Sequence, residues 1–85
     1  MKNKKRKGEF CYLSELVVKE RAVVERIDIE GFTLRRRLIE MGIIKGVFVE
    51  IKKIAPLGDP FSVVVRGFEL CIRKSELKKI FVRVV

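Results

Sequence analysis

The sequence of 85 residues contains no histidine, no tryptophan and no glutamine, and only two cysteines. Histidine is the side chain whose unperturbed pKa lies near neutrality and is the commonest ligand of transition metals, so its absence removes the usual general base and the usual metal ligand. The three serines have no histidine to activate them, and no glycine-rich phosphate-binding motif is present. We therefore expect a protein that is not an enzyme, with no catalytic residue, no cofactor and no metal site.

The two cysteines and the apolar segments exclude further classes. Cys11 and Cys71 are far apart and show no CxxC spacing, which is typical of isolated reduced thiols rather than of a zinc site, although the sequence leaves a disulfide between them open. The longest apolar run, residues 10–13, is much shorter than a signal peptide core or a membrane-spanning helix of about 20 residues. We expect a soluble, cytoplasmic protein that does not span a membrane.

Charge is abundant and unevenly distributed. Twenty basic and eleven acidic side chains give a net charge of +9, and five of the basic residues lie within the first seven residues. This stretch has no apolar residue after Met1 and ends in Gly8, so it predicts a disordered basic tail over residues 1–8 and a folded domain over residues 9–85. Such a tail either binds RNA or anionic lipid by counterion release or serves solubility alone.

The folded part has the alternation of apolar and polar residues that is typical of short strands. The expected strands are residues 20–29, 47–51, 61–65, 68–72 and 80–84. The pattern breaks at Lys52 and Lys53, as a β-bulge would cause. We predict a mainly β fold, a small and strongly bent barrel of about five strands whose closure removes exposed strand edges.

One α-helix is expected at about residues 33–41, and single helical turns at residues 13–16 and 75–77. Thr33 is the expected N-cap of the α-helix, and Leu34, Leu38 and Met41 form its apolar stripe. The expected structural turns lie at Gly42, Gly46, Pro56 and Gly67.

Two segments are candidates for recognition of a partner. On the helix, Arg35 and Arg36 point away from the apolar stripe and Ile39 lies beside them, although a solvated helix face is an equally ordinary explanation. The loop at residues 55–60 is stiffened by its prolines, which suits either a binding loop or a simple hairpin connection. Its candidate contact residues are Leu57, Gly58, Asp59 and Pro60.

The aromatic residues argue against nucleic acid as the partner. Single-stranded RNA is bound by exposed aromatic rings interleaved with basic residues. Most of the six phenylalanines occupy positions that we expect to be core.

Several segments together resemble one family. They are LSEL at 13–16, LRRRLIEMGI at 34–43, KG at 45–46, APLGDPF at 55–61 and VRGFELCIRKSE at 65–76, and they are similar to the FeoA domain of bacterial ferrous-iron transport. The likeness covers about residues 10–85. The sequence departs from the family at residues 17–19, where a Lys-Pro-Gly turn is common, and in its basic tail.

The resemblance implies an SH3-like β-barrel without catalytic residues. It further implies a cytoplasmic accessory protein that regulates or assembles the ferrous-iron permease FeoB by contacting its cytosolic G-protein part, which would hold it at the inner face of the membrane. The arginine helix and the residue 55–60 loop are then the natural contact sites. No small-molecule substrate is implied, and a weak homo-oligomer is compatible with the sequence.

Two alternatives belong to other classes. A small basic barrel could instead bind RNA or DNA, with an affinity that falls steeply with salt. FeoA-like domains also occur as appendages of iron-dependent repressors, but 85 residues cannot hold the DNA-binding and metal-binding domains that such a repressor needs.

Overall fold

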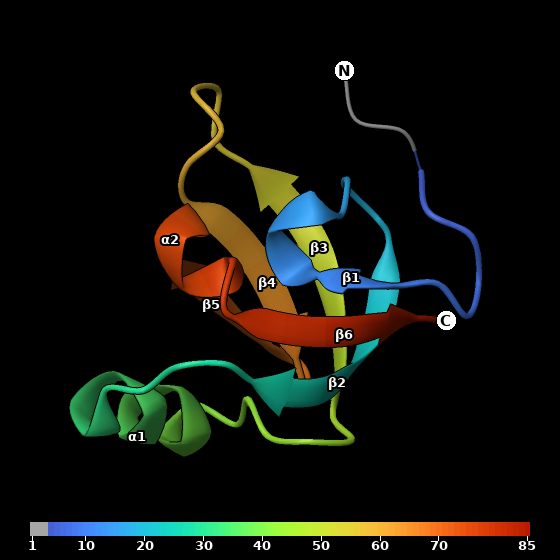
Figure 1. The fold of residues 1–85 in the computed structure, drawn as a ribbon. Coiled ribbons are helices and arrows are strands. Elements are labelled where there is room, and N and C mark those ends of the chain that lie inside the picture. The colour runs from blue at the N-terminus through green and yellow to red at the C-terminus, as the bar shows by residue number, and fades with distance from the viewer. Residues whose placement is uncertain (1–3) are drawn as a thin grey trace.

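The computed structural model describes residues 4–85. Its elements along the chain are β1 (Phe10–Tyr12), the 3-10 turn η1 (Leu13–Glu15), β2 (Arg21–Ile27), α1 (Phe32–Glu40), β3 (Phe48–Ile54), β4 (Phe61–Val65), β5 (Phe68–Ile72), the short helix α2 (Lys74–Leu77) and β6 (Ile80–Val84). The fold is mainly β, as predicted, but it has six strands rather than about five (Figure 1). Alternation does not reveal β1, because three residues are too few to show a period.

The strands form one antiparallel sheet in the order β1-β6-β2-β3-β4-β5. The turn predicted at Gly67 is confirmed: β4 pairs with β5 as a hairpin through a two-residue turn at Arg66 and Gly67, both with positive φ, as in the tight turns that match strand twist. The predicted bulge is also confirmed, since the β3–β4 register shifts between Ile51 and Lys53. A second shift occurs in β2, where it pairs with β6.

The predicted closure of the barrel is wrong. β1 and β5 are the two edges of the sheet and do not pair with each other. The helical turn η1 follows β1 and the helix α2 follows β5, and these two turns pack against each other instead. Side-chain packing therefore covers the opening that a ladder of backbone hydrogen bonds would otherwise close.

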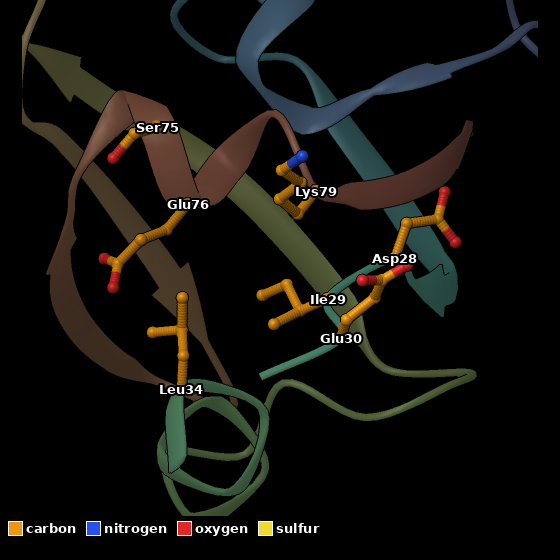
Figure 2. Close-up of a pocket in the computed structure, with 7 residues that line it drawn as sticks. All are labelled: Asp28, Ile29, Glu30, Leu34, Ser75, Glu76 and Lys79. Atoms are coloured by element: carbon orange, nitrogen blue, oxygen red, sulfur yellow. The ribbon is translucent and has the colours of Figure 1, made fainter. Parts of the chain in front are cut away.

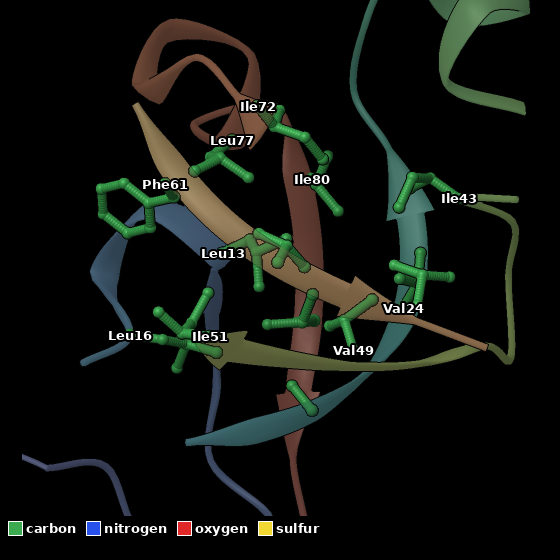
Figure 3. Packing of buried hydrophobic residues seen from close by; sticks show 14 of the residues in the cluster. Leu13, Leu16, Val24, Ile43, Val49, Ile51, Phe61, Ile72, Leu77 and Ile80 are labelled. Atoms are coloured by element: carbon green, nitrogen blue, oxygen red, sulfur yellow. The ribbon is translucent and has the colours of Figure 1, made fainter. Parts of the chain in front are cut away.

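The core lies inside the curled sheet and is wholly apolar in its centre (Figure 3). Its fully buried large side chains come from both helical turns, from α1 and from every strand except β1. They include Leu13, Leu16, Val24, Leu38, Ile43, Val49, Ile51, Phe61, Val63, Ile72, Leu77 and Ile80.

The expectation that most phenylalanines are core is wrong. Only Phe61 is fully buried, Phe81 is half-buried, and the side chains of Phe10, Phe32, Phe48 and Phe68 are exposed to between 54% and 75%. Phe10 and Phe48 lie on the outer face of the sheet, because their neighbours Cys11 and Val49 point inward. The argument from buried aromatics against nucleic acid is therefore lost.

The helix α1 begins at Phe32, one residue before the predicted range, and its N-cap is Gly31 rather than Thr33. Its C-terminal end is as expected: Gly42 follows with φ of +95°, a left-handed conformation that glycine adopts without strain. The Ile43 N–H then donates to the Leu38 carbonyl at 2.9 Å. This turn directs the chain back toward the sheet.

The predicted tail of residues 1–8 lies partly outside the described residues. In its described part, the Lys5 N–H donates to Glu20 and the Gly8 N–H donates to the Val84 carbonyl. These contacts join the segment to the sheet, and sequence patterning shows no sign of them.

Candidate functional site

The helix α1 lies at one end of the molecule (Figure 1). Of its nine residues only Leu38 is buried. Phe32 is 75% exposed and Ile39 is 44% exposed, and together with Arg35 and Arg36 they line a shallow hollow of about 290 Å³. The structure thus brings three predicted contact residues together on one helix face.

This apolar surface continues from the helix onto the following loop. A second hollow of about 210 Å³ is shared by Arg35, Ile39, Ile44 and Lys45, with part of β2 as its floor. We call Phe32, Arg35, Arg36, Ile39 and Ile44 the helix face. It pairs large exposed apolar side chains with guanidinium groups, a composition that is enriched in protein interfaces.

Sequence reasoning missed Phe32 and Ile44 as members of this face. Phe32 and Ile39 are seven residues apart, which is two turns of an α-helix and places both on the same side. That spacing could have identified Phe32. Nothing in the sequence places Ile44 beside the helix, because its position depends on the turn at Gly42.

Few contacts hold α1 to the rest of the fold. Leu38 is fully buried, and Leu34 and Met41 are partly buried against the core. The Arg37 guanidinium donates to the Glu76 carboxylate, and Glu76 also accepts from the Arg73 N–H at the start of α2. Arg37 therefore attaches α1 to α2. Arg35 has no ion pair among the described residues, and Arg36 pairs only with Glu40.

A groove of about 490 Å³ separates α1 from α2 (Figure 2). Ile29 and Leu34 form its apolar wall, and Asp28, Glu30 and Lys79 line its rim. The Arg37–Glu76 contact spans from one helix to the other beside it. The groove shows that α1 is braced at a few points and is not packed along its length.

The predicted contact loop lies at the opposite end of the molecule from α1 (Figure 1). Leu57 is 97% exposed at its tip, but the Asp59 carboxylate accepts from the Lys74 N–H at 2.9 Å and so caps the start of α2. The Asp59–Pro60 peptide is cis and Gly58 has φ of +86°. Helix and loop cannot belong to one small contact surface, and Asp59 has a structural partner.

Both thiols are free. Cys11 is buried, and burial raises the pKa of its thiol to about 11, whereas Cys71 is exposed on the edge strand β5. Among residues 4–85 no group of three or more cysteine, aspartate or glutamate side chains is placed to hold a metal ion. In the same part of the chain, no helix is long and apolar enough to cross a membrane.

Comparison with known proteins decides the family. The family model of the FeoA domain matches residues 11–84. The chain belongs to the FeoA family. The FeoA-like protein of Clostridium acetobutylicum has a solved structure with a TM-score of 0.81 and 38% identity, covering 95% of this chain and 91% of that one.

Two other FeoA relatives place the family in iron transport. The crystal structure of Stenotrophomonas maltophilia FeoA complexed with zinc has a TM-score of 0.74 and 35% identity over 84% of this chain and 87% of that one, and is described as a procaryotic SH3 domain protein. A fusion of Fe(2+) transport protein A with the Fe(2+) transporter FeoB from Porphyromonas gingivalis is 32% identical over 86% of this chain. The matched region is only 8% of that fusion protein.

Proposed function

We propose that this FeoA domain is a non-enzymatic accessory protein of ferrous-iron uptake that binds the cytosolic G-protein part of the permease FeoB through its helix face. The observation that carries the proposal is the relative in which a FeoA part and a FeoB part share one chain. Two parts of one chain meet at a high effective concentration, so a weak contact between them is sufficient for function. A FeoA domain that does not share a chain with FeoB lacks this advantage, so its own surface must provide the binding energy.

The helix face has the properties of such a surface. Phe32 and Ile39 offer apolar area that is exposed in the isolated domain, and Arg35 lies between them without an ion pair among the described residues. Aromatic and arginine side chains contribute most often to the few residues that dominate binding energy. The loop tip at Leu57 offers one exposed apolar side chain at the other end of the molecule.

The test is calorimetric titration of the purified cytosolic part of the permease with the full chain, in both nucleotide states. We expect Ile39→Asp to weaken binding by at least about tenfold, because a charge would be placed in an apolar contact, equivalent to about 1.4 kcal/mol. Leu57→Asp makes the same chemical change on an exposed side chain at the far end, and we expect it to leave the affinity unchanged.

A second pair of variants tests whether binding depends on the location of the positive charges or only on the net charge of the protein. Arg35→Glu with Arg36→Glu should weaken binding, whereas Lys53→Glu with Lys78→Glu changes the net charge equally at exposed sites outside the helix face and should not. Equal losses in both pairs, or loss only in Leu57→Asp, would show that the helix face is not the contact. Absence of binding by the unmodified chain in either nucleotide state at low salt would refute the function itself.

A further inference from the structure

Five basic side chains gather where the N-terminal segment, the start of β2 and the C-terminal end meet. They are Lys4, Lys5, Lys7, Lys19 and Arg21, and we call this cluster the basic end. They surround a small cleft of about 160 Å³ whose remaining lining is Glu20, Val84 and Val85. Residues more than ten positions apart in the sequence thus form one positive surface.

The buried carboxylate of Glu20 holds the N-terminal segment in place. The Glu20 side chain is 3% exposed, and its two oxygens accept from the Lys5 N–H at 2.5 Å and the Val17 N–H at 2.7 Å. The Gly8 N–H donates to the Val84 carbonyl at 2.6 Å. These bonds hold the lysine-rich segment against the sheet, so its charges occupy defined positions.

Most of the positive charge of the basic end is not compensated by ion pairs within the described residues. Lys4, Lys7, Lys19 and Arg21 have no ion pair with any residue between 4 and 85, and Lys5 has only a 3.7 Å contact with Glu9. Glu20, which accepts from two backbone N–H groups, supplies the one negative side chain that lines the cleft, against five cations. Elsewhere on the same sheet, Arg26 and Arg83 are each paired with a carboxylate. Four of the five cations of the basic end therefore lie close together without an ion pair among the described residues, and such a cluster attracts extended anionic surfaces.

The chemistry of the basic end favours a lipid surface over nucleic acid. No aromatic ring lines its cleft, whereas single-stranded nucleic acid is held by successive stacking platforms. Four of its five cations are lysines, which act as point charges and lack the planar fork that grips individual phosphates. Val18, next to Lys19, is 44% exposed and adds an apolar side chain that can enter the headgroup region.

We propose that the basic end binds the surface of an anionic lipid bilayer directly. Clusters of four to eight lysine or arginine residues are typical of proteins that bind anionic membranes, and each such residue raises the partition coefficient about fivefold. The basic end and α1 lie apart in the molecule, so lipid and a protein partner can be bound at the same time (Figure 1). The proposal does not depend on the permease contact.

The test is co-sedimentation of the full chain with vesicles of equal parts phosphatidylglycerol and phosphatidylcholine, at low salt and at high salt. We expect binding that is absent on pure phosphatidylcholine and is lost at high salt. The variant Lys4→Glu/Lys7→Glu/Lys19→Glu should lower the partition coefficient by at least about 100-fold, because three cations are removed.

The matched control is Lys53→Glu/Lys78→Glu/Lys79→Glu, which has the same net charge and changes three exposed lysines outside the basic end. We expect this control to lower the partition coefficient by less than about tenfold, because only the net charge of the whole molecule is reduced. Equal losses in the two variants would overturn the proposal, as would no binding to the anionic vesicles at low salt. Capture of an oligouridine strand by the basic end without vesicle binding would also overturn it and assign the cluster to nucleic acid.

Discussion

The contact between Arg37 and Glu76 is the point at which the attachment of α1 can be tested most sharply. Glu76 is 7% exposed and joins two elements, since it accepts from Arg37 of α1 and from the Arg73 N–H before α2. The substitution Glu76→Gln keeps the shape and one acceptor oxygen but removes the charge. The arginine side is 57% exposed, so water stabilises the cation that is left behind.

The magnitude follows from these exposures. Hydrogen bonds to charged groups contribute about 1.5–3 kcal/mol, and the solvated Arg37 partner places this contact at the lower end, about 1.5 kcal/mol. For a domain of this size, 1 kcal/mol corresponds to about 4–8 °C, so Glu76→Gln should lower the midpoint of thermal unfolding by about 6–12 °C. Circular dichroism during heating measures this midpoint directly.

The control is a second ion pair of α1. Glu40 pairs with Arg36 at 3.6 Å, and both side chains are 67% exposed. Glu40→Gln makes the same chemical change, and an exposed pair of this spacing contributes only about 0.3–0.5 kcal/mol, or less than about 4 °C. If Glu76→Gln lowers the midpoint no more than Glu40→Gln does, the Arg37–Glu76 contact does not attach α1 and our reasoning is refuted.

Two further predictions concern the titrating groups. The Cys11 thiol is buried and its pKa is raised to about 11, whereas Cys71 is exposed. A thiol reagent at about pH 8 should therefore modify one cysteine in the folded chain and both cysteines in denaturant. Rapid modification of both cysteines in the folded chain would contradict the burial of Cys11. Hydrogen bonds from Arg26 and Tyr12 hold the pKa of Asp28 below its usual value, so its contribution to stability is present above the unfolded pKa and is lost as pH falls through the lower folded pKa. Urea unfolding between about pH 5 and 2 should therefore show a smaller loss of stability in Asp28→Asn than in the unmodified chain, and parallel profiles would exclude this role.

Local patterns in the sequence were sufficient for most of the secondary structure. The strands from residue 47 onward, the bulge near Lys53 and the helix with its apolar stripe follow from periods of two and 3.6 residues, which neighbouring residues determine among themselves. The Arg36–Glu40 pair follows from helical spacing in the same way. These features need no knowledge of how distant segments meet.

Features that depend on the ends of the sheet could not be predicted. Alternation does not say whether the first and last strands of a sheet reach each other, so the open edge between β1 and β5 was not apparent. Most phenylalanines were assigned to the core for a related reason. Alternation shows that neighbouring residues lie on opposite faces of a strand, but it does not show which face is covered by the rest of the protein. Asp59 was assigned to the contact residues because the sequence does not show its structural partner. The Asp59 carboxylate accepts from the Lys74 N–H, fifteen positions away, and these two groups meet only after folding.

The sequence by itself determined what kinds of chemistry are available to this protein. A chain without histidine, with isolated thiols and with a surplus of lysine and arginine has side chains suited to contact and charge recognition, whatever its fold. Only the tertiary structure decided which of those side chains lie together on the surface. The Arg37–Glu76 contact attaches the helix face at one end, and the buried Glu20 carboxylate fixes the lysine-rich N-terminal segment at another, because each carboxylate binds one donor that is distant in sequence and close only after folding.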